Sequence, residues 1–170
     1  KNVIPKHLEA ISAKLIEMGC EVSEFDDAVR VVGKPRLTHT HVKTLPYPGF
    51  PTDIQALFTA VCSAAEGTAV FVETIFENRY RHIPELIRLG ASIKVEGRVA
   101  VVQGVEHLSG AKLCAGELRG GAALVTAALA AEGTSEITGV GYIDRGYESI
   151  EKALRSVGAD ISRVGQQSRN

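Results

Sequence analysis

Four charged residues of this 170-residue chain are spaced so that they could bind and transform an anionic ligand. Arg79 and Arg145 occupy equivalent places in two copies of one pattern offset by 66 residues, and the same offset places Asp53 on Arg119. Arginine suits phosphates and carboxylates because its planar guanidinium donates two parallel hydrogen bonds. The two arginines, at equivalent strand-to-helix loops, could together hold a dianionic ligand, but the local sequence favours an ion pair at each, such as Arg79 with Glu77. At Arg145 the partner would be Asp144.

The segment before Asp53 is conformationally restricted. Pro48 and Pro51 deliver Thr52 and Asp53 to the start of a helix. A threonine or aspartate there is a good N-cap. A carboxylate at the edge of a cleft could instead take a proton from a hydroxyl group. The two interpretations are compatible if Thr52 caps the helix and Asp53 faces the cleft.

A second charged turn, from Glu117 to Arg119, precedes the glycine pair at 120–121 and an apolar helix. Adjacent glycines permit close backbone approach, either to a ligand or to a packed neighbour. The spacings of dinucleotide-binding, P-loop and zinc-protease motifs are absent, so we expect no cofactor. His39 and His41 alternate without a third ligand, which favours a solvated loop over a metal site.

An internal repeat organises the elements around these residues. An amphipathic helix that runs into a glycine, followed by a strand of alternating polarity, recurs at Leu15–Val22, Leu86–Ile93 and Leu154–Ile161. Glycine supplies the left-handed residue that closes a helix C-terminus. The repetition predicts a duplicated unit of the form β-α-β-α-β-β.

Hydrophobic periodicity predicts an α/β fold built from these units. The expected helices span Pro5–Met18, Asp53–Ala65, His82–Leu89, Arg119–Ala131 and Tyr147–Val157. The expected strands span Cys20–Phe25, Ala28–Val32, Ala69–Glu73, Ser92–Glu96, Ala100–Gln103, Ser135–Gly139 and Asp160–Val164, with loops at Leu45–Thr52 and His107–Glu117. The helices at 54–65 and 120–131 are apolar nearly all round, so we expect them buried side by side and related by a near three-fold rotation.

The composition, 45% hydrophobic and 23% charged, is that of a globular domain with one core. A net charge of −1 offers no basic surplus for nucleic acid, and no apolar run approaches the roughly 20 residues of a membrane span. The three scattered cysteines predict reduced, intracellular thiols, with Cys62 and Cys114 in the core. The start at Lys1, without Met or targeting signal, is interpreted as that of a fragment of a longer protein.

Five segments together resemble the UDP-N-acetylglucosamine 1-carboxyvinyltransferase family. They are Leu45–Gln55, Glu73–Tyr80, Gly104–Ala111, Glu117–Ala122 and Ile143–Glu148, and the similarity runs nearly end to end. The resemblance implies an inside-out α/β barrel fold of six β-α-β-α-β-β units, three in each of two domains, with the active site between the domains. The chain resembles the C-terminal part, about two and a half units. Residues 1–170 are therefore expected to form a single domain that is incomplete at its N-terminus.

The resemblance further implies that the parent enzyme moves the enolpyruvyl group of phosphoenolpyruvate to the 3′-hydroxyl of UDP-N-acetylglucosamine. Phosphate is released, in the first committed step of peptidoglycan synthesis. Asp53 matches the residue that contacts the sugar and takes the hydroxyl proton, and Arg145 matches one that grips phosphoenolpyruvate. Arg79 and Arg119 match arginines that line the cleft, and the backbone of Ile75 matches a contact of the nucleotide sugar.

Glu117 stands at a substrate-binding position where the family usually has aspartate, and its extra methylene leaves its detailed role open. The family's N-terminal lysine, and the loop cysteine that fosfomycin attacks, belong to segments outside this sequence. We therefore expect one wall of a cytoplasmic active site, with the N-terminal domain as intramolecular partner. The chain alone is expected to be inactive and to self-associate through exposed faces. A related transferase acting on shikimate 3-phosphate and a non-catalytic module of the same fold are the alternatives.

Overall fold

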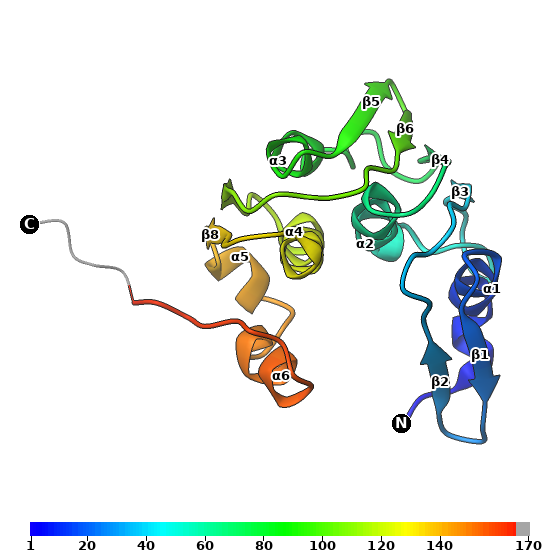
Figure 1. Ribbon diagram of the computed structural model, residues 1–170. Coiled ribbons are helices and arrows are strands. Elements are labelled where there is room, and N and C mark those ends of the chain that lie inside the picture. Colours follow the sequence, from blue (N-terminus) through cyan, green and yellow to red (C-terminus); the bar gives the residue numbers. More distant parts are fainter. Residues whose placement is uncertain (166–170) are drawn as a thin grey trace, which may run out of the picture.

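The computed structural model describes residues 1–165 and is mixed α/β (Figure 1). The middle unit has the predicted order and consists of β3 (Val42–Lys43), α2 (Thr52–Ser63), β4 (Thr68–Val72), α3 (Ile83–Arg88), β5 (Ser92–Glu96) and β6 (Val99–Gln103). Before it come a 3-10 helix (Pro5–Leu8), α1 (Glu9–Glu17), β1 (Glu21–Glu24) and β2 (Val29–Val32). After it come β7 (Lys112–Cys114), α4 (Leu118–Ala130), β8 (Glu136–Thr138), α5 (Gly141–Asp144) and α6 (Ile150–Ser156). None of the described helices is long and apolar enough to cross a membrane.

The glycine that follows each repeated helix is left-handed, as the sequence predicts. Gly19, Gly90 and Gly158 have φ angles of 92°, 94° and 98°. In all three copies the glycine N–H donates to the carbonyl three residues earlier, and the next N–H donates to the carbonyl five residues before it. This pattern satisfies the last carbonyls of a helix only if one residue adopts positive φ. The repeat is thus confirmed at the level of individual hydrogen bonds.

The strands of residues 1–165 form three separate sheets and do not close into a barrel. β1 and β2 form a hairpin, the central sheet has the order β3-β4-β6-β5, and β7 pairs with β8 in parallel. The two hairpins share one register, because Glu21 lies opposite Val32 and Ser92 lies opposite Gln103. Both residues of the first pair are shifted by 71 positions in the second, which is the separation between the repeated segments Leu15–Val22 and Leu86–Ile93.

Helices α2 and α4 lie side by side near the middle of the molecule (Figure 1). Phe58 of α2 and Leu124 of α4 belong to one apolar core and are 5% and 1% exposed. Phe71 of β4 and Val102 of β6 point from the central sheet into the same core. The predicted burial of the two helices is confirmed, and their relation by a near three-fold rotation stays a prediction.

The strand predicted at Asp160–Val164 is absent. An extended segment becomes a strand only where a neighbouring strand pairs with its backbone, and this segment pairs with none of the described strands. Instead, Arg163 donates two hydrogen bonds to Asp144, at 2.9 and 2.6 Å, and one to Glu151 at 3.0 Å. A side-chain clamp onto α5 and α6 takes the place of the predicted pairing.

Helix α5 interrupts the loop predicted between β8 and the last helix. Ile143 of α5 is 1% exposed and packs against Ala115 and Val125, which anchors one helical turn. The equivalent position 66 residues earlier is Glu77, whose side chain is 88% exposed. Without an apolar anchor, the earlier copy keeps an open loop. Sequence equivalence therefore does not extend to the local structure of these two segments.

The unit pattern implies a strand before each of the helices α2 and α4, but the sequence analysis did not locate β3 or β7, and β7 lies inside the loop expected at His107–Glu117. Two or three residues are too few to show an alternating pattern. Cys114 of β7 is exposed, so the prediction that it lies in the core is wrong. Its neighbour Leu113 takes the inward position, since successive strand residues face opposite sides. Cys62 is buried as predicted, and burial raises its thiol pKa to about 11.

Candidate active site

Asp53 lies in the first turn of α2 with its carboxylate partly in solvent. Helix α2 begins at Thr52, Pro51 occupies the N-cap position, and no side chain caps this end. The prediction that Thr52 or Asp53 caps the helix is therefore wrong, because both residues already lie inside it. A carboxylate in the first turn is favoured by the positive end of the helix dipole. The Asp53 side chain keeps 60% of its area exposed.

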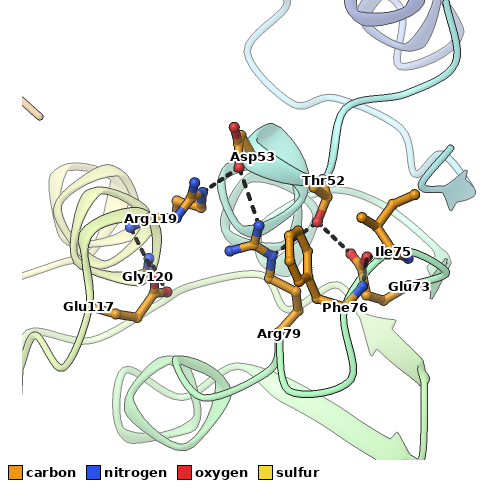
Figure 2. Close-up of polar contacts among 9 residues, drawn as sticks. All are labelled: Thr52, Asp53, Glu73, Ile75, Phe76, Arg79, Glu117, Arg119 and Gly120. Carbon is orange, nitrogen blue, oxygen red and sulfur yellow. Dashed lines mark hydrogen bonds and ion pairs between the residues drawn. The ribbon is translucent and has the colours of Figure 1, made fainter. Parts of the chain in front are cut away.

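Two arginines converge on one oxygen of this carboxylate (Figure 2). Nη2 of Arg79 lies 3.3 Å from Oδ1 of Asp53, and Nε of Arg119 donates to the same oxygen. The Arg79 side chain is 14% exposed and that of Arg119 is 35% exposed. Oδ2 of Asp53 accepts no hydrogen bond from residues 1–165. One oxygen is thus held by two cations, and the other remains available to a ligand.

The local ion pairs considered as alternatives do not form. Glu77 pairs with Arg98 at 3.2 Å, and Asp144 pairs with Arg163 at 2.6 Å. Arg79 instead contacts Asp53, which lies 26 positions earlier in the sequence.

Glu117 is the N-cap of α4 and faces its own helix. Its Oε1 accepts from the N–H of Gly120 at 2.6 Å, and its Oε2 accepts from the N–H of Arg119 at 3.2 Å. These bonds satisfy two of the unpaired donors at the helix start. They also fix the backbone from which Arg119 extends toward Asp53 (Figure 2). A substrate-binding role of Glu117 stays a prediction.

The glycine pair at 120–121 serves close packing. A Cβ on Gly120 would lie 2.6 Å from Glu117 Oε1 and 2.8 Å from Cβ of His82. A Cβ on Gly121 would lie 2.6 Å from Cγ1 of Ile143. Of the two interpretations of this pair, approach of a packed neighbour is the one that the structure shows.

The loop after β4 contributes residues that the sequence analysis missed. Glu73 is 1% exposed and accepts hydrogen bonds from the N–H groups of Ile75 and Phe76 and from the hydroxyl of Thr52. The guanidinium of Arg79 lies over the Phe76 ring, 4.3 Å from its centre. Phe76 is 51% exposed, so it adds apolar surface beside the charged cluster. The available signals for Glu73 were a carboxylate at the end of an expected buried strand and its place in the segment Glu73–Tyr80 that resembles the family.

His82 lies behind the cluster and is 4% exposed. Neither ring nitrogen has a hydrogen-bond partner in the described part of the chain. Burial lowers its pKa to about 4, which outweighs the opposing effects of the Glu117 charge and of the Arg79 backbone. The imidazole is therefore neutral near pH 7.

Arg145 does not join the cluster. It follows α5 and is exposed, and its side chain makes no hydrogen bond or ion pair with residues 1–165. The structure thus brings Asp53, Arg79 and Arg119 together, with Ile75 on the adjoining loop. A ligand contact of Arg145 stays a prediction. Residues 1–165 contain no group of three side chains arranged to hold a metal ion.

Solved structures of enolpyruvyl transferases share this fold. The enolpyruvyl transferase NikO from Streptomyces tendae matches 91% of this chain with a TM-score of 0.82 and 30% identity, over 36% of its own length. An EPSP synthase from Acinetobacter baumannii matches 92% of this chain and 37% of its own, with a TM-score of 0.70 and 18% identity. At 18% identity, the similarity to the EPSP synthase shows only that the two chains share a fold.

Sequence comparison identifies a narrower group within the enolpyruvyl transferases. The family model described as EPSP synthase (3-phosphoshikimate 1-carboxyvinyltransferase) matches residues 1–154. A UDP-N-acetylglucosamine 1-carboxyvinyltransferase 3 of Symbiobacterium thermophilum is 56% identical over 98% of this chain and 39% of its own length. A UDP-N-acetylglucosamine 1-carboxyvinyltransferase of Desulfofundulus thermocisternus is 56% identical over 96% of this chain and 68% of its own. The chain belongs to the UDP-N-acetylglucosamine 1-carboxyvinyltransferase group of the EPSP synthase family.

The chain spans about 39% of the length of the first relatives that it matches.

Proposed function

We propose that this chain forms one wall of an active site that transfers the enolpyruvyl group of phosphoenolpyruvate to the 3′-hydroxyl of UDP-N-acetylglucosamine. The observation that carries the proposal is the convergence of Arg79 and Arg119 on one oxygen of Asp53, whose other oxygen is open to a ligand. The names of the similar proteins and the shared fold support this reaction class.

The chemistry of the transfer matches what these three side chains can supply. The acceptor oxygen bonds to C2 of phosphoenolpyruvate while C3 takes up a proton from a general acid of the complete enzyme, and the open oxygen of Asp53 is suited to accept the hydroxyl proton. Elimination then breaks the bond from C2 to the phosphate oxygen and removes a proton from C3, which restores the double bond. The donor carries a phosphate and a carboxylate, whose charge must be balanced as the tetrahedral intermediate forms and phosphate departs. Arg79 and Arg119 can bind these anionic groups through the N–H groups that do not contact Asp53, because a guanidinium has five donors and binds both kinds of oxyanion.

Three further residues receive roles within the proposal. The N–H of Ile75 is bonded to Glu73 at 2.9 Å, which leaves the Ile75 carbonyl as the backbone group for the nucleotide sugar. Glu117 holds the start of α4 and so the direction of Arg119. Arg145, exposed after α5, is assigned to phosphoenolpyruvate on the family resemblance. The reaction is placed in the cytoplasm, and the N-terminal domain of the longer relatives supplies the opposite wall of the cleft.

A second candidate acceptor is shikimate 3-phosphate, because the matching family model carries the description of that transferase. The fold and the arginine cluster would serve either acceptor.

The acceptor is tested with a chimera. The part of the Symbiobacterium thermophilum relative that this chain does not span is joined to residues 1–170, and phosphate release from phosphoenolpyruvate is measured with each acceptor. We expect release with UDP-N-acetylglucosamine and none with shikimate 3-phosphate. The complete relative is the positive control, and each part alone is the negative control. Release only with shikimate 3-phosphate would identify the other transferase, and a folded chimera inactive with both acceptors would favour a non-catalytic module.

A further inference from the structure

A buried carboxylate lies directly behind the candidate active site. Oε1 of Glu73 accepts hydrogen bonds from the N–H groups of Ile75 and Phe76 at 2.9 and 3.0 Å. Oε2 of Glu73 accepts from the hydroxyl of Thr52 at 2.9 Å. A buried charge is costly unless it is hydrogen-bonded. These three donors therefore compensate a side chain that is only 1% exposed.

The hydroxyl of Thr52 lies between Glu73 and Arg79 and contacts both (Figure 2). Chemistry fixes which group donates in each of these two hydrogen bonds. Nε of Arg79 lies 3.0 Å from Oγ1 of Thr52, and a guanidinium can donate but not accept. The hydroxyl therefore accepts from Arg79 and gives its single hydrogen to Glu73. The chain Arg79 to Thr52 to Glu73 ends on a buried negative charge, which polarises each of its links.

Arg79 is held from three sides. Its Nε is bonded to Thr52, its Nη2 contacts Asp53 at 3.3 Å, and its planar group covers the Phe76 ring. The direction of its remaining N–H groups is thus set before any ligand arrives. A guanidinium that is already ordered loses little side-chain freedom on binding.

We propose that Glu73 is a positioning residue, which orients Arg79 through Thr52 and fixes the loop beside Asp53 through the amides of Ile75 and Phe76. The inference rests on the proposed function only for the identity of the ligand of Arg79, a phosphate or carboxylate substrate. Glu73 does not touch that ligand. The competing explanation is that Glu73 merely closes the turn after β4, in which case its link to Thr52 is dispensable.

The link itself is tested on the 170-residue chain by nitrogen-15 NMR of the arginine Nε–H groups. Arg79→Lys identifies the Arg79 signal. Thr52→Val keeps the side-chain shape without the hydroxyl, and Thr52→Ser restores the hydroxyl. We expect the Nε–H of Arg79 to exchange with water about tenfold faster in Thr52→Val, the scale of one hydrogen bond to a charged group. Thr52→Ser should resemble the wild type, and Arg119, whose Nε donates to Asp53, is the internal reference.

Glu73→Gln separates the two explanations. The amide oxygen can still accept from Ile75 and Phe76, so the turn is retained. The NH2 group of the glutamine then faces the hydroxyl of Thr52. Because NH2 is a donor, the hydroxyl hydrogen of Thr52 has lost its acceptor, and the hydroxyl oxygen now faces a second donor besides Arg79. We expect Arg79 exchange to accelerate as in Thr52→Val. Unchanged Arg79 exchange in Glu73→Gln would overturn the inference, whatever the result in Thr52→Val.

The consequence for catalysis is measured in the chimera. Thr52→Val and Glu73→Gln should each raise KM for phosphoenolpyruvate about tenfold and leave KM for UDP-N-acetylglucosamine within about twofold. Thr126→Val is the matched control, because the hydroxyl of Thr126 in α4 donates to the carbonyl of Ala122 and not to the site.

Wild-type KM values in Glu73→Gln, together with a lower unfolding midpoint, would also overturn the inference, since that is the result of a purely structural role. A wild-type chimera that releases no phosphate would count against the proposed function, whereas the exchange measurement decides the Glu73 link independently.

Discussion

At the scale of single residues, the site depends on one carboxylate placed between two arginines and a ligand. Asp53→Asn keeps the shape of the side chain and can still accept from Arg79 or Arg119, but an amide does not take up the hydroxyl proton. In the chimera, we expect kcat to fall about 10²–10⁴-fold, with little change in the Kd for UDP-N-acetylglucosamine measured by calorimetry. Near-normal turnover would reduce Asp53 to a positioning group.

Arg145→Lys should affect the other substrate. Lysine keeps the charge but loses the planar fork that binds an oxyanion through two hydrogen bonds. In steady-state kinetics of the chimera, KM for phosphoenolpyruvate should therefore rise more than KM for UDP-N-acetylglucosamine. Arg88→Lys, at an exposed position in the last turn of α3, is the control. An effect confined to the nucleotide sugar would show that Arg145 is assigned to the wrong ligand.

His82 makes stability depend on pH. Burial lowers its pKa to about 4, whereas the unfolded chain has the ordinary value of about 6.5. The unfolded state therefore takes up the proton first as the pH falls. The free energy of unfolding should be highest above about pH 6.5 and should decrease by up to about 3 kcal/mol as the pH falls toward 4. Urea unfolding at several pH values measures this decrease.

His82→Leu is the control for that titration, because leucine fills the buried position without a titratable group. Hydrogen bonds from Arg163 lower the pKa values of Asp144 and Glu151, so these carboxylates add their own loss of stability at more acidic pH in both proteins. The difference between the two proteins between pH 6.5 and 4 isolates His82. Parallel curves would contradict the assignment of a buried neutral imidazole.

At the scale of elements, the packing of α5 on α4 determines where Arg145 lies. Gly121→Ala would place a methyl group 2.6 Å from Ile143, the residue that anchors α5. Overpacking costs about 1–3 kcal/mol, which exceeds the gain of at most about 1 kcal/mol from replacing a helical glycine by alanine. We expect a net destabilisation of about 1–2 kcal/mol in denaturant unfolding. Gly116→Ala, with no atom within 4 Å of the added group, should be nearly neutral.

At the scale of the whole molecule, exposed apolar residues and strand edges favour association. β1 and β2 form a sheet of two strands, and Val31 and Val32 on β2 are 45% and 39% exposed. An exposed apolar edge strand is a site for pairing with another chain. We expect light scattering to show dimers or larger species at high concentration. Val31→Lys should reduce them, and a wild-type monomer at every concentration would refute this expectation.

The sequence by itself determined the repeat, the order of elements in the middle unit and the burial of α2 and α4. These features follow from local properties: the period of apolar residues, and a glycine whose missing Cβ permits positive φ at each helix end. The family resemblance also rests on local segments, the five motifs between Leu45 and Glu148, and the comparisons confirm it. The 66-residue offset also paired Asp53 with Arg119, which proved to be a contact in space.

Only the tertiary structure decided which partner each charged residue contacts. Arg79 reaches Asp53 and Thr52 across more than 25 residues of sequence, and Glu73 is a site residue only because Thr52 lies beside it in the folded chain. The segment predicted as the last strand pairs with none of the described strands. Arg145 follows the helix α5 because Ile143 packs against Ala115 and Val125. Hydrogen-bond partners and packing neighbours depend on distances between segments that a linear pattern does not contain.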